Sequence, residues 1–365
     1  MNYISNIDTV CILVDVQDYE SSNANLLSYL LEEKEKAKMY TINNSSYKHL
    51  ININNMNFQI SINGTKGYTY ILQNNGYQIN VAQFKSKLEN FMPIQIRISS
   101  EYLWSYGISN AWGIIYNWIT ETFGNIITEK VFRLDLCCHV SDIDFITNNE
   151  TSYKGDFKKR QIFYTGNNIN SITFGSRKSK NIYCRIYNKS LEIQEMKHKT
   201  WFYEIWKNNS MNINNVWNVE FEIKSDFLRE FNISTINEVI EHLQDLWQYC
   251  TTKWLLKIDR TNIRVERCNI NIDWLKIQKT YNNFKSIGLI EKQRQIEFDA
   301  NILVPNIVGN ITSYSARKGK LNIDEAFSIL YKDTKKYLSR KDTCFEKEVN
   351  NKLSFLHDCE VRKNE

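Results

Sequence analysis

The sequence predicts an α+β fold, in which a mostly antiparallel β-sheet packs against a few long helices. Three observations predict it. Several short runs alternate apolar and polar side chains, as strands with one covered face do. Glycines mark turns between neighbouring runs, and longer stretches place apolar residues at helical spacing.

The first part of the chain predicts strands and helices in turn. In order, they are a buried strand at residues 10–16, a helix at 25–38, Gly-marked strands within 58–80, a strand at 93–98 and a helix at 110–123. We expect turns near Gly64, Gly67 and Gly76. Gly124 is expected to end the helix at 110–123.

The later part predicts strands at 130–140, 182–187 and 216–223, then a long helix at 235–256. Thr235 and Glu238 form a capping box at the start of that helix. Its apolar stripe is Ile236, Val239, Ile240, Leu243, Trp247, Cys250 and Trp254. From about residue 290 the chain is polar and helix-prone. We expect a main region at 1–290, built as one body or two sub-lobes, and a polar helix-rich extension at 291–365.

Composition excludes several classes of protein. Apolar residues make up 42% of the 365, which excludes wholesale disorder. No run of about 18 apolar residues predicts a membrane span, and the first residues do not resemble a secretory signal. The eight cysteines form no CxxC pair and no zinc spacing. We expect reduced, buried cysteines and a cytoplasmic protein.

The net charge of +5 is unevenly distributed. Residues 151–200 hold eleven Lys or Arg and three Asp or Glu, a balance of +8, so the remaining residues sum to −3. A concentrated basic window is typical of a surface that contacts a phosphodiester backbone.

The three later strands each have an apolar face and a polar face, because side chains alternate along a strand. The polar faces carry, in chain order, Arg133, Asp135, Cys137 and His139, then Tyr183, Arg185, Tyr187 and Lys189, then Asn218, Glu220, Glu222 and Lys224. One interpretation is that these faces simply meet water. If they share one sheet face, however, they gather a reactive set of acids, bases and tyrosines.

That set predicts two kinds of chemistry. Asp135, Glu220 and Glu222 would suit Mg²⁺ or Mn²⁺, although surface carboxylates paired with Arg133 or Lys224 are the alternative. A tyrosine flanked by cations is a candidate nucleophile, since nearby positive charge favours the phenolate.

The motifs RLDLCCH (133–139), FGSRKSKNIYCRIYNKSLEI (174–193) and VWNVEFEIKSDFLREFNI (216–233) resemble the replication initiation factor family. That family includes rolling-circle plasmid replication initiators of the staphylococcal type and related relaxases of integrative conjugative elements. The segments VCILVDV, PIQIRISSEYLW, LWQYCTTKWL and RTNIRVERCNINIDW are also similar, so that the resemblance spans roughly residues 8–315.

The resemblance implies a metal-dependent DNA endonuclease that initiates rolling-circle replication of a plasmid or mobile element. Such enzymes nick one strand at an origin and stay joined to its 5′ phosphate through a tyrosine. It implies an active site on the polar face of the sheet in region 1–290. It also implies origin DNA, a host superfamily 1 helicase and a homodimer as partners.

The family motifs fall on particular residues. The catalytic tyrosine falls on Tyr187, with Tyr183 as the rival, and its basic flanks fall on Arg185 and Lys189; the motif acid falls on Glu192. The metal would be held by Asp135, Glu220 and Glu222, with His139 as a further ligand or proton carrier, or merely hydrogen-bonded. The residues expected at DNA phosphates are Arg133, Arg177, Lys178, Lys180 and Lys224.

Some features leave alternatives open. Asn218 stands where many relatives have Arg, and His139 stands where many have Asp. A conjugative relaxase would use the same chemistry, and a non-catalytic DNA-binding regulator would keep only the fold. The aromatic residues at 201–206 would either stack unpaired bases or, as their helical spacing favours, pack in the core.

Overall fold

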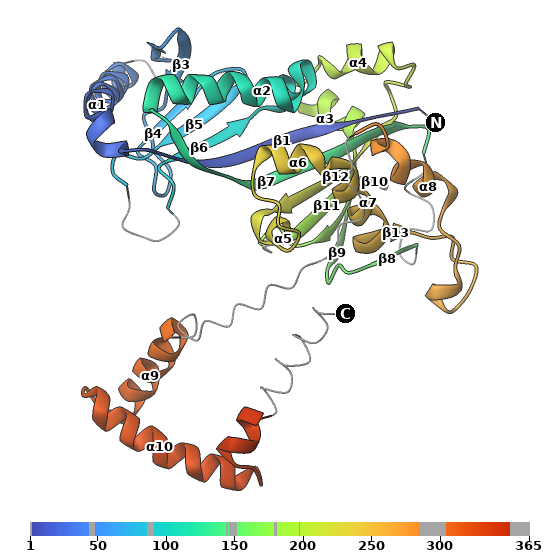
Figure 1. The fold of residues 1–365 in the computed structure, drawn as a ribbon. Helices are drawn as coiled ribbons and strands as arrows, with labels where there is room; N and C mark the ends of the chain where they lie inside the picture. The colour runs from blue at the N-terminus through green and yellow to red at the C-terminus, as the bar shows by residue number, and fades with distance from the viewer. Residues whose placement is uncertain are drawn as a thin grey trace. The chain divides into compact units, whose positions relative to one another are not determined.

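A computed structural model describes residues 2–43, 48–85, 91–143, 145, 152–178, 181–196, 198–284 and 304–350 (Figure 1). The chain divides into two compact units, Met1–Gln293 and Arg294–Glu365. The first unit combines a large antiparallel sheet with several helices, which confirms the predicted α+β class.

An eleven-stranded sheet forms the first unit within the described residues, and each of its pairings is antiparallel. In sheet order its strands are β2 Leu50–Ile53, β3 Met56–Ile60, β4 Tyr70–Gln73, β5 Tyr77–Val81, β6 Ile94–Ile98, β1 Tyr3–Val16, β7 Ile126–Ser141, β12 Val216–Lys224, β11 Ile182–Asn188, β10 Asn168–Gly175 and β9 Arg160–Thr165. A separate two-stranded sheet pairs β8 Tyr153–Gly155 with β13 Leu255–Lys257.

Two long helices, α1 Tyr19–Asn43 and α2 Ser100–Phe123, cover one face of the sheet (Figure 1). Alternate residues of β1, such as Val10, Ile12 and Val14, are fully buried on that side. The shorter helices are α3 Lys189–Met196, α4 Phe202–Asn208, α5 Ser225–Arg229, α6 Ile236–Glu241, α7 Leu243–Tyr249 and α8 Ile272–Gln278. In the described part of the chain, no helix is long and apolar enough to cross a membrane.

The predicted strands exist, but several are longer than their apolar runs. For example, β1 begins at Tyr3, because its first residues pair with β7 although their sequence is polar. Helix α2 ends at Gly124 as predicted, with φ of 104°, and begins at an N-cap formed by Ser99. An N-cap serine stabilises that start because its oxygen accepts a backbone N–H that has no partner within the helix. Gly107 (φ 73°, ψ 162°) breaks the helical geometry of α2, so the predicted helix at 110–123 lies within the part that follows this kink.

The prediction of one helix at 235–256 is wrong. The Thr235–Glu238 capping box forms, and helix α6 follows it. The chain leaves helical geometry at His242 (φ −112°, ψ 13°), continues as α7, widens into a π-helical turn at Cys250–Trp254, and enters β13. Pairing of β13 with β8 requires extended backbone, which explains why the apolar stripe does not continue as helix.

Gly155 lets β8 approach β13 closely. Its φ is +150°, and a Cβ atom there would lie 2.1 Å from the carbonyl oxygen of Trp254. We expect Gly155→Ala to lower the free energy of unfolding by about 3 kcal/mol, measured by urea denaturation. Gly166→Ala is the matched control: its φ is also positive, +60°, but the surrounding space is open, so we expect a loss of about 1 kcal/mol. Equal losses would contradict the steric argument.

The second unit contains two helices, α9 Val304–Lys318 and α10 Ile323–Arg340. Asn322 caps the start of α10 by accepting hydrogen bonds from the backbone N–H groups of Asp324 and Glu325. The two helices are joined by Asp333, which accepts from Tyr314 Oη at 2.7 Å and pairs with Lys318 at 2.9 Å. These contacts are exposed, so they contribute little stability individually.

Candidate functional site

The predicted polar faces share one side of the sheet, because β7, β12 and β11 are neighbours. The register places residues opposite one another in rows: His139, Asn218 and Tyr187 in one; Cys137, Glu220 and Arg185 in the next; Asp135, Glu222 and Tyr183 in the third. Directly opposed side chains in antiparallel strands lie about 5 Å apart at Cβ. The interpretation that these faces meet water is wrong for their centre, where Asp135, Glu220 and Asn218 are buried.

Tyr187 lies at the centre of a hydrogen-bonded cluster. Its Oη atom donates to Glu220 Oε2 at 3.1 Å and accepts from Lys189 Nζ at 3.1 Å and Asn218 Nδ2 at 3.0 Å. The Arg185 guanidinium lies 5.1 Å from the centroid of the Tyr187 ring and pairs with Glu220 at 2.5 Å. Lys189, the first residue of α3, is 1% exposed and pairs with Glu192 at 2.5 Å.

Burial outweighs the effect of Arg185, which lowers the pKa of Tyr187 as predicted for a nearby cation. Burial raises the pKa of Tyr187 well above its ordinary value, and the carboxylates of Glu220 and Glu192 add to the rise, while Arg185 opposes it. A phenol that is 9% exposed loses the water that would stabilise its anion. The neutral phenol is therefore the resting form, and any attack by it needs a proton acceptor.

The three predicted metal ligands lie close together, but arginines bind their oxygens. Arg133 binds Asp135 through Nε and Nη2 at 2.9 and 2.6 Å, and the same guanidinium lies 3.1 Å from Glu222. Arg185 occupies Glu220 Oε1. The three carboxylates are therefore ion-paired, as the alternative to a metal site predicted, but they are buried rather than at the surface.

This donor set does not fit a metal ion as it stands. Across the residues that the structure describes, no group of three or more His, Cys, Asp or Glu side chains is placed to hold one. A cation at Asp135, Glu220 and Glu222 would have to displace two half-buried guanidinium groups from their buried carboxylate partners, which is costly. The Mg²⁺ or Mn²⁺ requirement therefore stays a prediction from the resemblance.

Burial raises the pKa of Asp135 to about 7; Glu220 and Glu222 add to the rise, and Arg133 opposes it. Between about pH 4 and pH 7 the folded chain therefore binds a proton that the unfolded chain has released. This group consequently makes the free energy of unfolding fall as pH rises through that window.

Asp135→Asn removes this titration. We expect the variant to gain stability relative to the wild type as pH rises from 4 to 8, by on the order of 4 kcal/mol at most. Urea denaturation of both proteins across that range measures the difference. A difference that does not change with pH would contradict the assignment, whereas a constant loss from the unpaired Arg133 would not.

A further acid, Asp8, was missed by the sequence analysis. The β1–β7 register shifts between Ile7 and Thr9, so that Asp8 is the extra residue of a bulge, which re-aims a side chain. Asp8 is 7% exposed and accepts a hydrogen bond from Ser100 Oγ at 2.7 Å, and Lys199 lies 3.8 Å away. Lys199 and Lys189 lower its pKa against the effect of burial, so the carboxylate stays charged. In the sequence Asp8 lies just before the predicted strand at 10–16, among polar residues, so no pattern indicated its place in the site.

His139, predicted as a metal ligand, as a proton carrier or as merely hydrogen-bonded, has no surface that solvent reaches. It is fully buried, stacks on Trp104 with centroids 5.0 Å apart, and accepts a hydrogen bond from Trp206 Nε1 at 3.0 Å through Nδ1. Burial, with Lys189 and Lys199, lowers its pKa well below the usual range. The geometry favours packing as its role. Phe202 and Trp206 are buried beside it, in agreement with the expectation that aromatic residues at 201–206 pack in the core.

The residues predicted to contact phosphate lie mainly at one end of the polar face. Arg177 is 54% exposed, lies 3.4 Å from Glu222, and covers the ring of the rival Tyr183 at 5.6 Å. Lys178 is exposed, while Lys224 donates to the Arg177 carbonyl and pairs with Glu222 at 3.5 Å. Arg133 belongs to the carboxylate cluster, and Lys180 lies outside the described residues.

Comparisons with known proteins leave the family open. No protein-family model and no curated protein matches the chain. The similar solved structures include a rolling circle replication initiator protein from Geobacillus stearothermophilus, with a TM-score of 0.46 and 12% sequence identity. The match covers 80% of this chain and 100% of that one. At this level the likeness does not decide the activity, which is argued below from the residues themselves.

Proposed function

We propose that this chain cuts one strand of DNA by transesterification, with Tyr187 as the nucleophile. The observation that supports this most is the set of contacts at Tyr187 Oη, where a proton acceptor, Glu220, and a cationic donor, Lys189, each lie at 3.1 Å. An activated nucleophile is recognised by such a base within hydrogen-bond reach.

Glu220 is the proposed proton acceptor. Because burial holds Tyr187 neutral, its proton must leave during the attack, and in the described part of the chain Glu220 is the carboxylate hydrogen-bonded to it. The proton passes from Oη to Glu220 Oε2 as Oη bonds to phosphorus. The bond from phosphorus to the 3′ oxygen breaks, and that oxygen takes a proton from water. The products are a 5′ phosphotyrosine and a free 3′ hydroxyl.

Lys189 and Arg185 stabilise the negative charge that gathers at the phosphate. Lys189 is buried and Arg185 is half-buried, at 5.3 and 5.1 Å from the ring centroid, and fixed cations in a water-poor site act strongly on developing charge. Arg185 also holds Glu220 in place at 2.5 Å. Asn218, at the position where many relatives have Arg, orients the phenol through its hydrogen bond to Oη.

The basic window supplies the surface for the DNA backbone. Residues 151–200 contribute β9, β10 and β11, which are neighbours at one edge of the sheet, and the hairpin that carries Arg177 and Lys178. Lys159, Arg177 and Lys178 lie at the Tyr183 end of β11, so the DNA backbone is expected to run along this strand from that end toward Tyr187. Contacts of this kind give affinity that falls steeply with salt.

The chemistry serves a rolling-circle replication initiator of a plasmid or mobile element, and it would equally serve a conjugative relaxase. The helicase and homodimer partners rest on the resemblance alone. A non-catalytic DNA-binding regulator is the second candidate, and the low exposure of Tyr187, 9%, is the observation that favours it. A nucleophile must be reached by its substrate, so catalysis requires the cluster to open when DNA binds.

One experiment separates these candidates. Supercoiled DNA carrying the region upstream of the coding sequence is incubated with the protein, with Mn²⁺ and separately with EDTA. The proposal expects open circles with protein attached to the 5′ end of the nick. Binding without any nicking in either condition would favour the regulator and contradict the proposal. Comparison of the two conditions also tests the metal requirement.

A further inference from the structure

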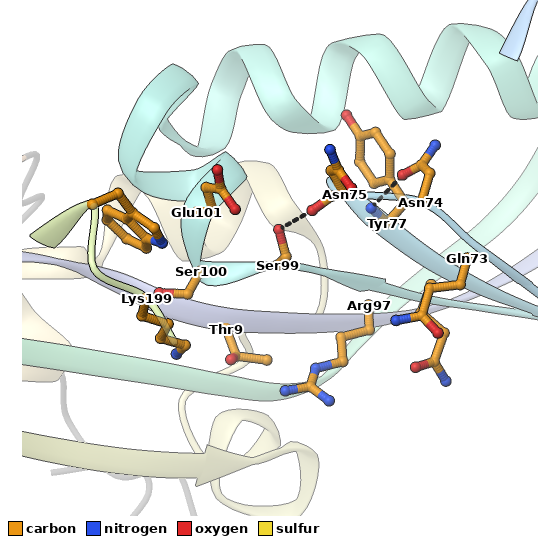
Figure 2. Close-up of a pocket in the computed structure, with 12 residues that line it drawn as sticks. Thr9, Gln73, Asn74, Asn75, Tyr77, Arg97, Ser99, Ser100, Glu101 and Lys199 are labelled. Carbon is orange, nitrogen blue, oxygen red and sulfur yellow. Dashed lines mark hydrogen bonds between the residues drawn. The ribbon is translucent and has the colours of Figure 1, made fainter. Parts of the chain in front are cut away.

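A polar pocket of about 270 Å³ lies beside strands β4 to β6, where helix α2 begins (Figure 2). The residues that matter for its chemistry are Asn75, Gln78, Arg97, Glu101, Lys199 and Trp201. They come from the β4–β5 turn, strands β5 and β6, the first turn of α2 and the segment before α4. None of these residues has a role in the proposed reaction.

The pocket is connected to the Tyr187 cluster through Asp8. Ser100 and Lys199, both in the pocket lining, contact Asp8 at 2.7 and 3.8 Å. Asp8 in turn lies within electrostatic reach of Lys189, which lowers its pKa, and Lys189 donates to Tyr187. A ligand in the pocket would therefore lie next to Asp8, whose strand β1 is the sheet neighbour of β7 on the side of the reacting centre.

The charges of the lining suit a phosphate at one side of the pocket. Arg97 is exposed and makes no ion pair or hydrogen bond with the described residues. Lys199 forms only the longer ion pair with Asp8 within the same part of the chain. Glu101 is the one carboxylate in the lining, and it lies on the α2 side. Phosphate oxygens would therefore meet the two cations, away from Glu101.

The remaining lining suits an unpaired base. Trp201 is half-buried, and its ring stacks on Phe202 with centroids 3.8 Å apart, so one aromatic surface is held rigidly. Gln78 donates to Asn80 at 3.1 Å, and the side chain of Asn75 makes no hydrogen bond with the described residues, which leaves amide atoms for base edges. Aromatic stacking with amide contacts is the usual way proteins hold single-stranded nucleotides.

We propose that this pocket binds one unpaired nucleotide of the strand that is cut, a short distance along the chain from the scissile phosphate. The base stacks on Trp201, its edge meets Asn75 and Gln78, and its phosphate lies against Arg97 and Lys199. This inference rests on the proposed function for the identity of the strand, because Asp8 connects the pocket to Tyr187. It adds a site that holds the strand in register for attack.

The test measures binding of fluorescein-labelled oligo(dT)12 and of an abasic 12-mer with the same phosphates, by anisotropy, with full-length protein carrying Tyr187→Phe so that no cutting occurs. We expect Trp201→Ala to weaken binding of oligo(dT)12 about 5- to 100-fold and to leave the abasic 12-mer within about twofold. Trp201→Phe, which keeps an aromatic ring, should recover most of the loss. Unchanged oligo(dT)12 binding, or an equal loss on both probes, would overturn the proposal.

A second arm does not depend on Trp201, which packs on Phe202 and whose removal could unfold the chain. Arg97→Gln should reduce the salt slope of oligo(dT)12 binding by about 0.7, the value for one phosphate on a single strand. Lys38→Gln is the matched control, because Lys38 lies on α1 and pairs with Glu35 instead. An unchanged slope for Arg97→Gln would overturn the phosphate contact. Displacement of the probe by micromolar dTMP would overturn it too, by indicating a site for free nucleotides.

These measurements are independent of nicking. If the wild type never nicks DNA but the Trp201 pattern holds, the proposed reaction fails and the base pocket survives. If nicking occurs and Trp201→Ala binds both probes as the wild type does, the pocket assignment alone fails.

Discussion

Replacing Tyr187 with Phe is expected to reduce nicking by at least about 10³-fold and to remove the covalent protein–DNA product. The reason is that Phe keeps the ring between Arg185 and Lys189 but lacks the oxygen that would bond to phosphorus. DNA binding should stay within about twofold, because Oη is 3.1 Å from Glu220 inside the cluster and is not a surface contact. Gel mobility of protein-linked DNA measures the product, and anisotropy measures binding.

Tyr183→Phe is the matched control for this prediction. Tyr183 lies on the same face of the same strand, two residues earlier, opposite Glu222 rather than Asn218. Its ring lies under Arg177, and no hydrogen bond joins it to the described carboxylates or to Lys189. We expect Tyr183→Phe to nick at close to the wild-type rate. Loss of nicking in this variant, with Tyr187→Phe active, would show that the rival tyrosine is the nucleophile.

Replacing Glu220 with Gln should slow nicking by about 10²- to 10⁴-fold, the usual contribution of a positioned general base. Gln keeps the shape and accepts a hydrogen bond from Tyr187 but does not take its proton. Glu220→Asp, which keeps a carboxylate, should recover part of the rate. The rate of open-circle formation at saturating protein measures each effect.

Two controls are needed to interpret the rate of Glu220→Gln. Glu222→Gln changes a buried carboxylate on the same face of β12 that does not contact Tyr187, so its rate should stay within about threefold of the wild type. Glu220→Gln also leaves Arg185 with less compensation, so thermal unfolding must show a folded variant before its rate is interpreted. A folded Glu220→Gln with a wild-type rate would exclude Glu220 as the proton acceptor.

Much of the site was predictable because side chains alternate along strands. The period of two places Asp135, Glu220 and Tyr187 on polar faces from sequence alone, and antiparallel pairing brings those faces together. The exact register was not predictable, since it depends on how β7, β12 and β11 align. That register decides that Arg185 meets Glu220 and that Asn218 meets Tyr187.

Three features depended on tertiary packing and were missed or mistaken. Asp8 joins the site only because β1 bulges against β7. The direction of the Tyr187 pKa depends on burial, which the pattern of charges in the sequence does not report. His139 turns out to be packed among aromatic rings, because α4 places Trp206 and Phe202 over the end of the polar face.

The most direct test of the central claim is to identify the tyrosine that carries DNA. Protein linked to nicked DNA is treated with nuclease and trypsin, and the peptides are analysed by mass spectrometry. Trypsin cuts after Lys180, Arg185 and Lys189, so Tyr183 and Tyr187 fall in different peptides, 181–185 and 186–189. The account predicts a phosphonucleotide on peptide 186–189. A phosphonucleotide on 181–185, or on neither peptide, would contradict it.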